Sequence, residues 1–267
     1  MKHVALERDG AVAIVKLCTG DVPFLTNPMC GELDGLLTEL GNDASVRAIV
    51  LTGARPGLFV MHYSVAELVA LSETLRSSGF KPSDDRPYEP GPFDKVLNHL
   101  ESMSKPTIAA INGDCMGGAF EMSLACDVRL AEDAVYRIGL PEITIAILPG
   151  GGGTQRLTKL VGLDRALDHM LRGEPISPRA AYEKGFVTEL VAGPVLSVAI
   201  TRAKRYAAQD PRAAAHIKRL AHLARKASLE EGLKLERNLF LDLTVRDEAH
   251  RLMTDYEAGR VRFEGAR

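Results

Sequence analysis

Short apolar runs that end at turn dipeptides alternate along this chain with stretches of helical periodicity, and this alternation restricts the fold most. The apolar, strand-like runs are Val46–Leu51, Thr107–Ile111 and Val128–Leu130. The stretches with helical spacing of apolar residues span 29–40 and Ala119–Cys126. Strands joined by crossover helices produce this pattern, so we predict an α/β fold.

The two ends of the chain differ in their patterns. The Asp9-Gly10 dipeptide separates two runs rich in Val, Ala and Ile, which predicts a β-hairpin over 4–17. From about Val195 strand signals cease, and Ser228-x-x-Glu231 matches a helix capping box. We therefore divide the chain into a core, residues 1–194, and a C-terminal helical region, residues 195–267.

Residues 70–93 interrupt the alternation. Prolines at positions 82, 87, 90 and 92 stand among Gly, Ser, Asp and Arg. Such a composition is typical of exposed connections, so we expect a mobile loop from Ala70 to Phe93.

Composition narrows the classes of function. The 267 residues carry a formal charge of -2 with only 5% aromatic side chains, a poor match to a nucleic-acid-binding surface. The histidines form no HxH or HExxH pattern, so no metal site is expected. The sequence also has no signal-peptide stretch and no apolar run of membrane-spanning length. The four cysteines lack CxxC spacing and are expected to be buried thiols of a reducing compartment, which favours a cytoplasmic protein.

Two glutamates are isolated in apolar surroundings. Glu121 is the only charged residue between Cys115 and Cys126, and Glu142 is the only one between Ile138 and Pro149. Carboxyl groups in such settings have shifted pKa values, as general acid/base catalysis requires. The alternative is structural: each could cap a helix or pair with an arginine such as Arg129 or Arg156.

Glycines strengthen the catalytic interpretation. Gly117-Gly118 joins a strand-like run to a helical stretch, so the amide of Gly118 is expected at a helix N-terminus that favours an anion. An amide donor and the Glu121 carboxylate would then face one pocket, an arrangement that can stabilise an enolate. The segment is not a Walker A loop, because Ala119-Phe120 follows where Lys-Ser/Thr is required. The glycines at 150–153 lack the dinucleotide-binding spacing and fit a loop better.

Several ordered motifs resemble the crotonase superfamily, the enoyl-CoA hydratase/isomerase family, over nearly the whole chain. The motifs are Lys105–Gly113, Met116–Asp127, Leu140-Pro-Glu142 and Leu148–Leu157, with Asn27 and Val46–Gly53 upstream. The resemblance implies a spiral of ββα units with a C-terminal helical trimerisation region, and homotrimers or dimers of trimers. It also implies an acyl-CoA thioester as substrate, a place in fatty acid metabolism, and no nucleic-acid or membrane partner.

The resemblance assigns roles to single residues. Glu121 and Glu142 match the paired catalytic glutamates of hydratases, and the amides of Tyr63 and Gly118 match the oxyanion hole. Further positions, Phe24, Leu25, Met61 and His62, match places that contact CoA or substrate. The implied reaction is hydration of a 2-enoyl-CoA to a 3-hydroxyacyl-CoA, or the reverse dehydration, without a cofactor other than the coenzyme A of the substrate.

The first oxyanion loop departs from the family pattern. The family has small residues there, whereas this chain has Met61-His62-Tyr63-Ser64. His62 could contact a polar substrate or be structural, and Tyr63 could line the acyl pocket or only pack. Alternatives on the same scaffold are an isomerase, a decarboxylase or a hydrolase; a non-catalytic CoA- or RNA-binding protein is the alternative from another class.

Overall fold

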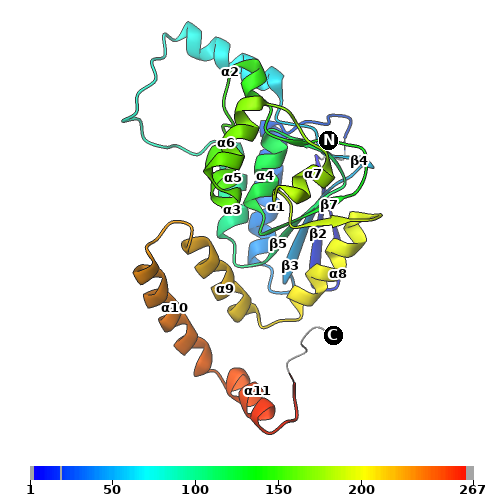
Figure 1. Cartoon of the computed structure of the whole chain (residues 1–267), viewed down its shortest axis with the longest axis vertical. Helices are drawn as coiled ribbons and strands as arrows, with labels where there is room; N and C mark the ends of the chain where they lie inside the picture. Colours follow the sequence, from blue (N-terminus) through cyan, green and yellow to red (C-terminus); the bar gives the residue numbers. More distant parts are fainter. Residues whose placement is uncertain (1–2, 19, 263–267) are drawn as a thin grey trace. The chain divides into compact units, whose positions relative to one another are not determined.

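The computed structural model describes residues 3–18 and 20–262, which form two compact units that divide between Gln209 and Asp210. The first unit contains two sheets (Figure 1). The larger sheet has the strand order β1-β2-β3-β5-β7-β9, and the smaller one has the order β4-β6-β8. The strands of the larger sheet are β1 (Val4–Asp9), β2 (Val12–Leu17), β3 (Ala48–Gly53), β5 (Thr107–Ile111), β7 (Val128–Glu132) and β9 (Glu189–Val191). Those of the smaller sheet are β4 (Gly57–Val60), β6 (Gly113–Met116) and β8 (Ile138–Gly139).

From β3 onward, successive strands alternate between the two sheets. The pairs β3/β4, β5/β6 and β7/β8 each give one strand to the larger sheet and the next to the smaller, and a helical segment follows each pair. All strand pairs are parallel except the predicted hairpin, β1 and β2, which is antiparallel with Asp9 opposite Val12. This is the expected α/β spiral of ββα turns.

The inner strands β2, β3 and β5 of the larger sheet are covered on both faces, which explains their nearly continuous apolar sequences. In β3, Ile49 and Leu51 join the main core, while Ala48 and Val50 face the other way. That second face is covered by helix α8 (Val195–Ala207). Burial on both faces thus removes the polar alternation of a half-exposed strand.

The remaining helices of the first unit follow from local signals. Helix α1 has Thr26 as its N-cap, and a buried stripe that includes Leu33, Leu37 and Leu40. Ser177 caps α7, as its Ser-Pro signal indicates. The helices are α1 (Asn27–Asn42), α2 (Val65–Ser77), α3 (Pro92–Ser102), α4 (Gly118–Ala125), α5 (Gly153–Val161), α6 (Leu163–Arg172) and α7 (Pro178–Glu183), with the short 3-10 helix η1 (Glu142–Ile145).

The loop expected over 70–93 was predicted too long. Helix α2 continues to Ser77 because Ser64 caps it and no proline occurs before position 82. Its side chains are not buried, so it lacked the apolar stripe that would have shown it in the sequence. Residues 78–91 between α2 and α3 are irregular and form the wide arc in Figure 1.

The second unit is helical. It contains α9 (Pro211–Leu223), α10 (Leu229–Thr244) and α11 (Asp247–Glu257). The predicted capping box is present, since Ser228 and Glu231 exchange hydrogen bonds at the start of α10. The helical region predicted from residue 195 begins with α8, which packs on the larger sheet, and the compact first unit extends through Gln209.

Two other sequence features can be compared with the structure. All four cysteines are free and buried, as expected. Among the described residues, no helix combines the length and apolar composition that a membrane span requires.

Candidate functional site

Glu121 lies on α4, whose residues are all buried. The residue is only 2% exposed, and its Oε1 accepts a hydrogen bond of 2.7 Å from the Gly153 N–H. Burial is the main cause that raises the pKa of Glu121 to about 7; the negative charge of Glu142 adds to it, and the amides of Gly153 and Gly151 oppose it. Because Gly153 begins α5, this carboxylate also caps a helix, so one structural alternative is realised at the same residue.

Glu142 begins the 3-10 helix η1. Its Oε2 is buried and has no hydrogen-bond partner among the described residues. Burial raises the pKa of Glu142 to about 7. Its Oε1 points to Gly117-Gly118, which we name the glycine corner, since a Cβ built on Gly117 would lie 3.1 Å from this oxygen. An unpartnered carboxyl oxygen in this place is available to a bound molecule.

The two arginines considered as partners are directed mainly to other groups. Arg129 donates to the carbonyl oxygens of Phe186 and Cys126. Arg156 pairs with Glu101 at 3.2 Å, and its charge lowers the pKa of Glu121. Burial is the main cause of the raised pKa of both carboxyl groups, and the charge of Glu142 raises the pKa of Glu121 further.

The glycine corner lies against Tyr63. Gly117 has φ +53°, which a side chain would strain, and Gly118 begins α4. A Cβ on Gly118 would lie 3.0 Å from the Tyr63 Cβ. Tyr63 forms a parallel bridge with Leu25 in which the bonds run from Leu25 N–H to His62 and from Ser64 N–H to Leu25. In such a bridge the Tyr63 N–H points away from Leu25. Outside the regular helix and strand ladders of the described residues, neither the Tyr63 N–H nor the Gly118 N–H donates a backbone hydrogen bond.

Hydrogen bonds fix the side chain of Tyr63. Its phenol donates to Glu67 Oε2 at 2.7 Å and lies 3.0 Å from Asn27 Oδ1. Glu67 in turn accepts from the Asn27 N–H at 3.0 Å, so one carboxylate joins the first turns of α1 and α2. Burial, followed by the bond to Glu67, raises the pKa of Tyr63. The phenol is thereby held in a fixed network.

The four residues predicted to contact CoA or substrate lie on one short ladder. Leu25 is buried, and its N–H donates to the His62 carbonyl at 2.9 Å. The Met61 N–H donates to the Pro23 carbonyl at 2.9 Å. The His62 ring stacks on Phe24 with centroids 4.6 Å apart. Its Nδ1 donates to the Tyr63 carbonyl at 2.7 Å, because a carbonyl can only accept, and this leaves Nε2 unprotonated in the neutral ring.

Sequence reasoning missed several neighbours of the site. Phe93, where α3 begins, packs against Tyr63 with ring centroids 5.6 Å apart, and a Cβ on Gly151 would lie 2.4 Å from its ring. No local signal distinguished Phe93 at the end of a proline-rich segment. Glu67 had a signal, since Ser64-x-x-Glu67 is a capping-box pattern, but its contact with Tyr63 depends on the fold.

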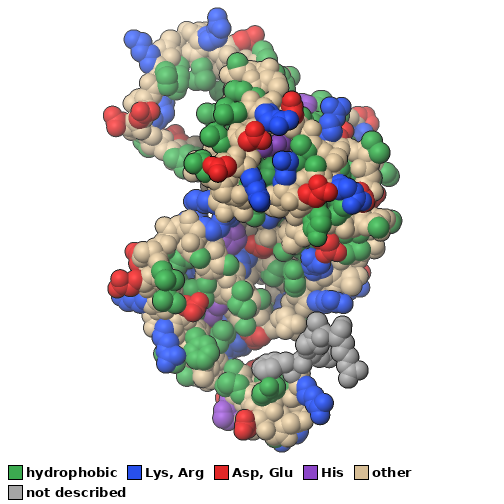
Figure 2. Space-filling model, viewed as in Figure 1, with side chains coloured by type: hydrophobic (Ala, Val, Ile, Leu, Met, Phe, Trp, Pro, Cys, Tyr) green, Lys and Arg blue, Asp and Glu red, His purple; other side chains and the backbone are tan. Residues whose placement is uncertain are grey.

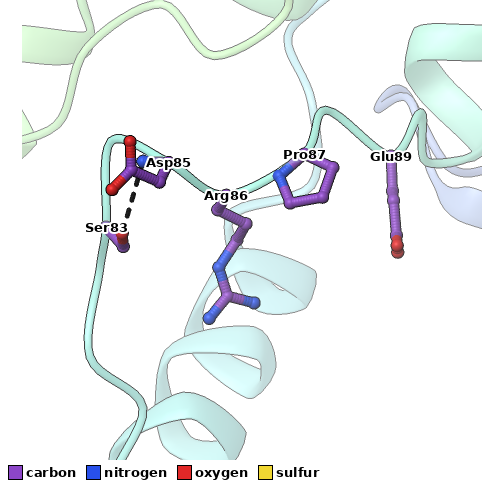
Figure 3. Close-up of a pocket in the computed structure, with 5 residues that line it drawn as sticks. All are labelled: Ser83, Asp85, Arg86, Pro87 and Glu89. Carbon is purple, nitrogen blue, oxygen red and sulfur yellow. Dashed lines mark hydrogen bonds between the residues drawn. The ribbon is translucent and has the colours of Figure 1, made fainter.

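A separate pocket of about 560 Å³ opens in the irregular segment between α2 and α3. It is lined by Ser83, Asp85, Arg86, Pro87 and Glu89, which are shown in Figure 3. None of these is a predicted site residue, and their shallow arrangement on an exposed arc offers no acid/base pair in an apolar setting. We therefore place the candidate site at the two glutamates and the glycine corner. In the part of the chain that the structure describes, no cluster of three or more His, Cys, Asp or Glu could hold a metal ion.

Comparison with known proteins addresses the chain as a whole. The family model described as enoyl-CoA hydratase/isomerase matches residues 7–266. The fatty acid oxidation complex subunit alpha of Shewanella frigidimarina is 35% identical over 210 residues, which cover 74% of this chain and 27% of that protein. The chain thus spans about a quarter of the length of the curated relatives it matches.

Two solved structures extend the comparison. The enoyl-CoA hydratase of Bacillus anthracis has a TM-score of 0.85 and 27% identity, with 97% of each chain covered. Pseudomonas aeruginosa DspI has a TM-score of 0.84 and 27% identity, with 97% of this chain and 95% of that chain covered. The similarity to both structures therefore includes the C-terminal helices.

Proposed function

This chain belongs to the enoyl-CoA hydratase/isomerase family, and from that premise we propose that it hydrates a 2-enoyl-CoA thioester to a 3-hydroxyacyl-CoA, or catalyses the reverse dehydration. The observation that carries this proposal is the pair of glutamates, Glu121 and Glu142, both with a pKa raised to about 7. A pair that holds one proton near neutral pH supplies one base and one acid at once.

The glycine corner supplies the second requirement. Addition to a conjugated thioester places negative charge on the thioester oxygen. We propose that the amides of Tyr63 and Gly118 donate to that oxygen. A Cβ on Gly118 would lie 3.0 Å from the Tyr63 Cβ, and α4 begins at Gly118, so its N-terminal dipole favours the charge. Donors fixed before the reaction stabilise the enolate without reorganisation.

Hydration would proceed through two proton transfers. Glu121 takes a proton from water, the water oxygen bonds to C3, and the electron pair of the C2–C3 double bond moves toward the thioester oxygen. The enolate then takes a proton at C2 from Glu142. The product has gained one water, and the pair returns to its first state when the proton on Glu121 passes to Glu142 through solvent.

The proposal also defines the partners of this chain. The acyl-CoA thioester is the substrate, and the ladder of Phe24, Leu25, Met61 and His62 is the proposed CoA-side surface. The chemistry needs no metal or redox group, since both protons and the enolate are handled by protein groups. Because the curated relatives are named as fatty acid oxidation proteins, we propose fatty acid oxidation as the metabolic setting.

The test mixes the protein with a panel of 2-enoyl-CoA thioesters that differ in their acyl groups. The loss of enoyl absorbance measures hydration. We expect hydration of at least one member. The reverse assay uses 3-hydroxyacyl-CoA thioesters and follows the gain of that absorbance. Absence of both reactions across the panel would reject the hydratase assignment, and conversion of a 3-enoyl-CoA to the 2-enoyl isomer instead would assign an isomerase.

A further inference from the structure

One buried histidine is not used in the proposed chemistry. His169 on α6 is 6% exposed, and its Nε2 accepts a hydrogen bond of 3.1 Å from the Leu140 N–H. The ring also meets Phe186 edge-on, with centroids 4.8 Å apart and planes at 74°. Contacts on two sides therefore fix its orientation.

The hydrogen bond determines the state of the ring. Because Nε2 accepts, the single proton of the neutral imidazole is on Nδ1. Burial lowers the pKa of His169 to about 4; Lys184 and Arg172 lower it further, and Asp168 opposes them. At neutral pH the ring is thus an uncharged acceptor.

The segment that His169 holds lies between the two halves of the site. We name Gly139-Leu140 the strap. On one side the Gly139 carbonyl accepts the Gly117 N–H at 2.8 Å, next to the proposed oxyanion amide of Gly118. On the other side a Cβ on Gly139 would lie 2.8 Å from His169 Nε2, so the imidazole sits directly against the strap backbone.

The strap also leads to Glu142. Pro141 has no N–H, so the Leu140 amide is the last backbone donor before Glu142. Upstream, Ile138 exchanges two backbone hydrogen bonds with Ile176, of 2.9 and 2.8 Å. Between that bridge and Glu142, the side chain of His169 anchors the strap by its hydrogen bond to Leu140.

We propose that His169 is a positioning residue that, through the strap, holds the Glu142 carboxyl beside the Gly117-Gly118 corner. This inference rests on the proposed hydration chemistry. An apolar side chain of similar size would fill the space but leave the buried Leu140 N–H without an acceptor, and relief of that cost would move the strap. Displacement of an acid by about 1 Å can reduce turnover by about 100-fold.

The experiment compares His169→Leu, which removes the acceptor, with His169→Gln, whose amide oxygen can accept the Leu140 N–H. Exposed His250 supplies a matched control, His250→Leu. Steady-state hydration gives kcat and KM for each variant. Infrared titration of the Glu142 carboxyl, assigned by the band lost in Glu142→Gln, reports its environment without any need for activity.

We expect His169→Leu to lower kcat by roughly 10- to 100-fold with KM within twofold, and to shift the Glu142 titration. We expect His169→Gln to retain kcat within threefold and His250→Leu to match the wild type. Wild-type kcat and an unshifted titration in His169→Leu would overturn the proposal. If the wild type hydrates no thioester but His169→Leu still shifts the titration, the proposed function fails while the positioning stands.

A measurement on the wild type remains decisive if His169→Leu does not fold. In protein carrying ¹⁵N-labelled histidine, we expect the His169 resonances at pH 7 to show a proton on Nδ1 and none on Nε2. A proton on Nε2 would overturn the proposal, because that nitrogen could not then accept the Leu140 N–H.

Discussion

At the scale of single residues, the proposed chemistry depends on two carboxyl groups that stand in apolar stretches of the chain. Glu121 and Glu142 were conspicuous in the sequence because each stands alone in an apolar stretch, and the structure gives both a raised pKa through burial. Their roles in hydration are proposals, and they are open to direct tests.

Replacement of either glutamate should affect turnover far more than binding. We expect Glu121→Gln and Glu142→Gln each to lower kcat by roughly 10²-fold or more, with KM within a fewfold, because each removes a proton transfer. Glu39→Gln, on the exposed side of α1, is the matched control. Full activity in Glu121→Gln together with an inactive Glu142→Gln would favour isomerase chemistry.

The coupled pair also predicts how activity depends on pH. Below the pKa values near 7 both carboxyls hold protons and no base is present; above them both are ionised and no acid is present. We therefore expect kcat to have a bell-shaped pH profile with its maximum near 7. A kcat that stays constant from pH 5 to 9 would contradict the shared-proton pair.

Tyr63 gives a prediction about stability. Tyr63→Phe removes the phenol that donates to Glu67 at 2.7 Å, and Glu67→Gln replaces the charged acceptor. We expect each change to lower the free energy of unfolding by about 1 kcal/mol, and the double variant to lose clearly less than the sum. Urea unfolding measures this, with Tyr182→Phe as an exposed control; additive losses would show that the two side chains do not interact.

At the scale of elements, short segments are held by residues distant in sequence. The strap is hydrogen-bonded to Gly117, the N-cap of α4, and to His169 on α6. Glu121 on α4 likewise binds the first amide of α5. Each of these bonds joins two elements whose separate sequences predict only the elements themselves.

Burial of His169 makes stability depend on pH. The pKa is about 4 in the folded chain against an ordinary value of 6.5. Above pH 6.5 the ring is neutral in the folded and the unfolded chain, so its full contribution to the free energy of unfolding is present. As pH falls from 6.5 to 4, the unfolded chain binds a proton that the folded chain does not, and the free energy of unfolding falls by up to roughly 3 kcal/mol.

Chemical denaturation of the wild type and His169→Gln at a series of pH values checks this prediction. We expect the difference in unfolding free energy between the two proteins to change across the range from 6.5 to 4 and to be constant above it. A difference that stays constant throughout would show that His169 does not titrate differently in the two states.

At the scale of the whole molecule, the second unit presents apolar side chains that its own helices do not cover. On α10, Leu233 and Phe240 are 52% and 56% exposed and stand seven residues apart on one face. Hydrophobic side chains gather over this helix in Figure 2. Such faces commonly mark contacts between subunits.

We expect the protein to form trimers or dimers of trimers, with a mass three or six times 28.9 kDa by light scattering. Leu233→Glu and Phe240→Glu should lower that mass, because each places a charge in an apolar contact. Leu71→Glu on exposed α2 is the control. A wild-type monomer at micromolar concentration would contradict this prediction.

Local signals predicted most elements of the fold. The Asp9-Gly10 turn, the apolar stripe of α1 and the Ser228 capping box all have the structures that their patterns indicate. The sequence patterns failed where a helix buries no apolar face. Helix α2 has no buried stripe, and its residues 70–77 were taken for loop.

The sequence by itself determined the α/β alternation, the glycine corner and the two isolated carboxyls, because each depends on residues close together in the chain. Only the tertiary structure decided that Phe93 packs on Tyr63, that Tyr63 bonds to Asn27, and that His169 holds Leu140. Such contacts join segments separated by tens of residues, and side-chain type alone does not specify which distant backbone amide or ring will be the partner.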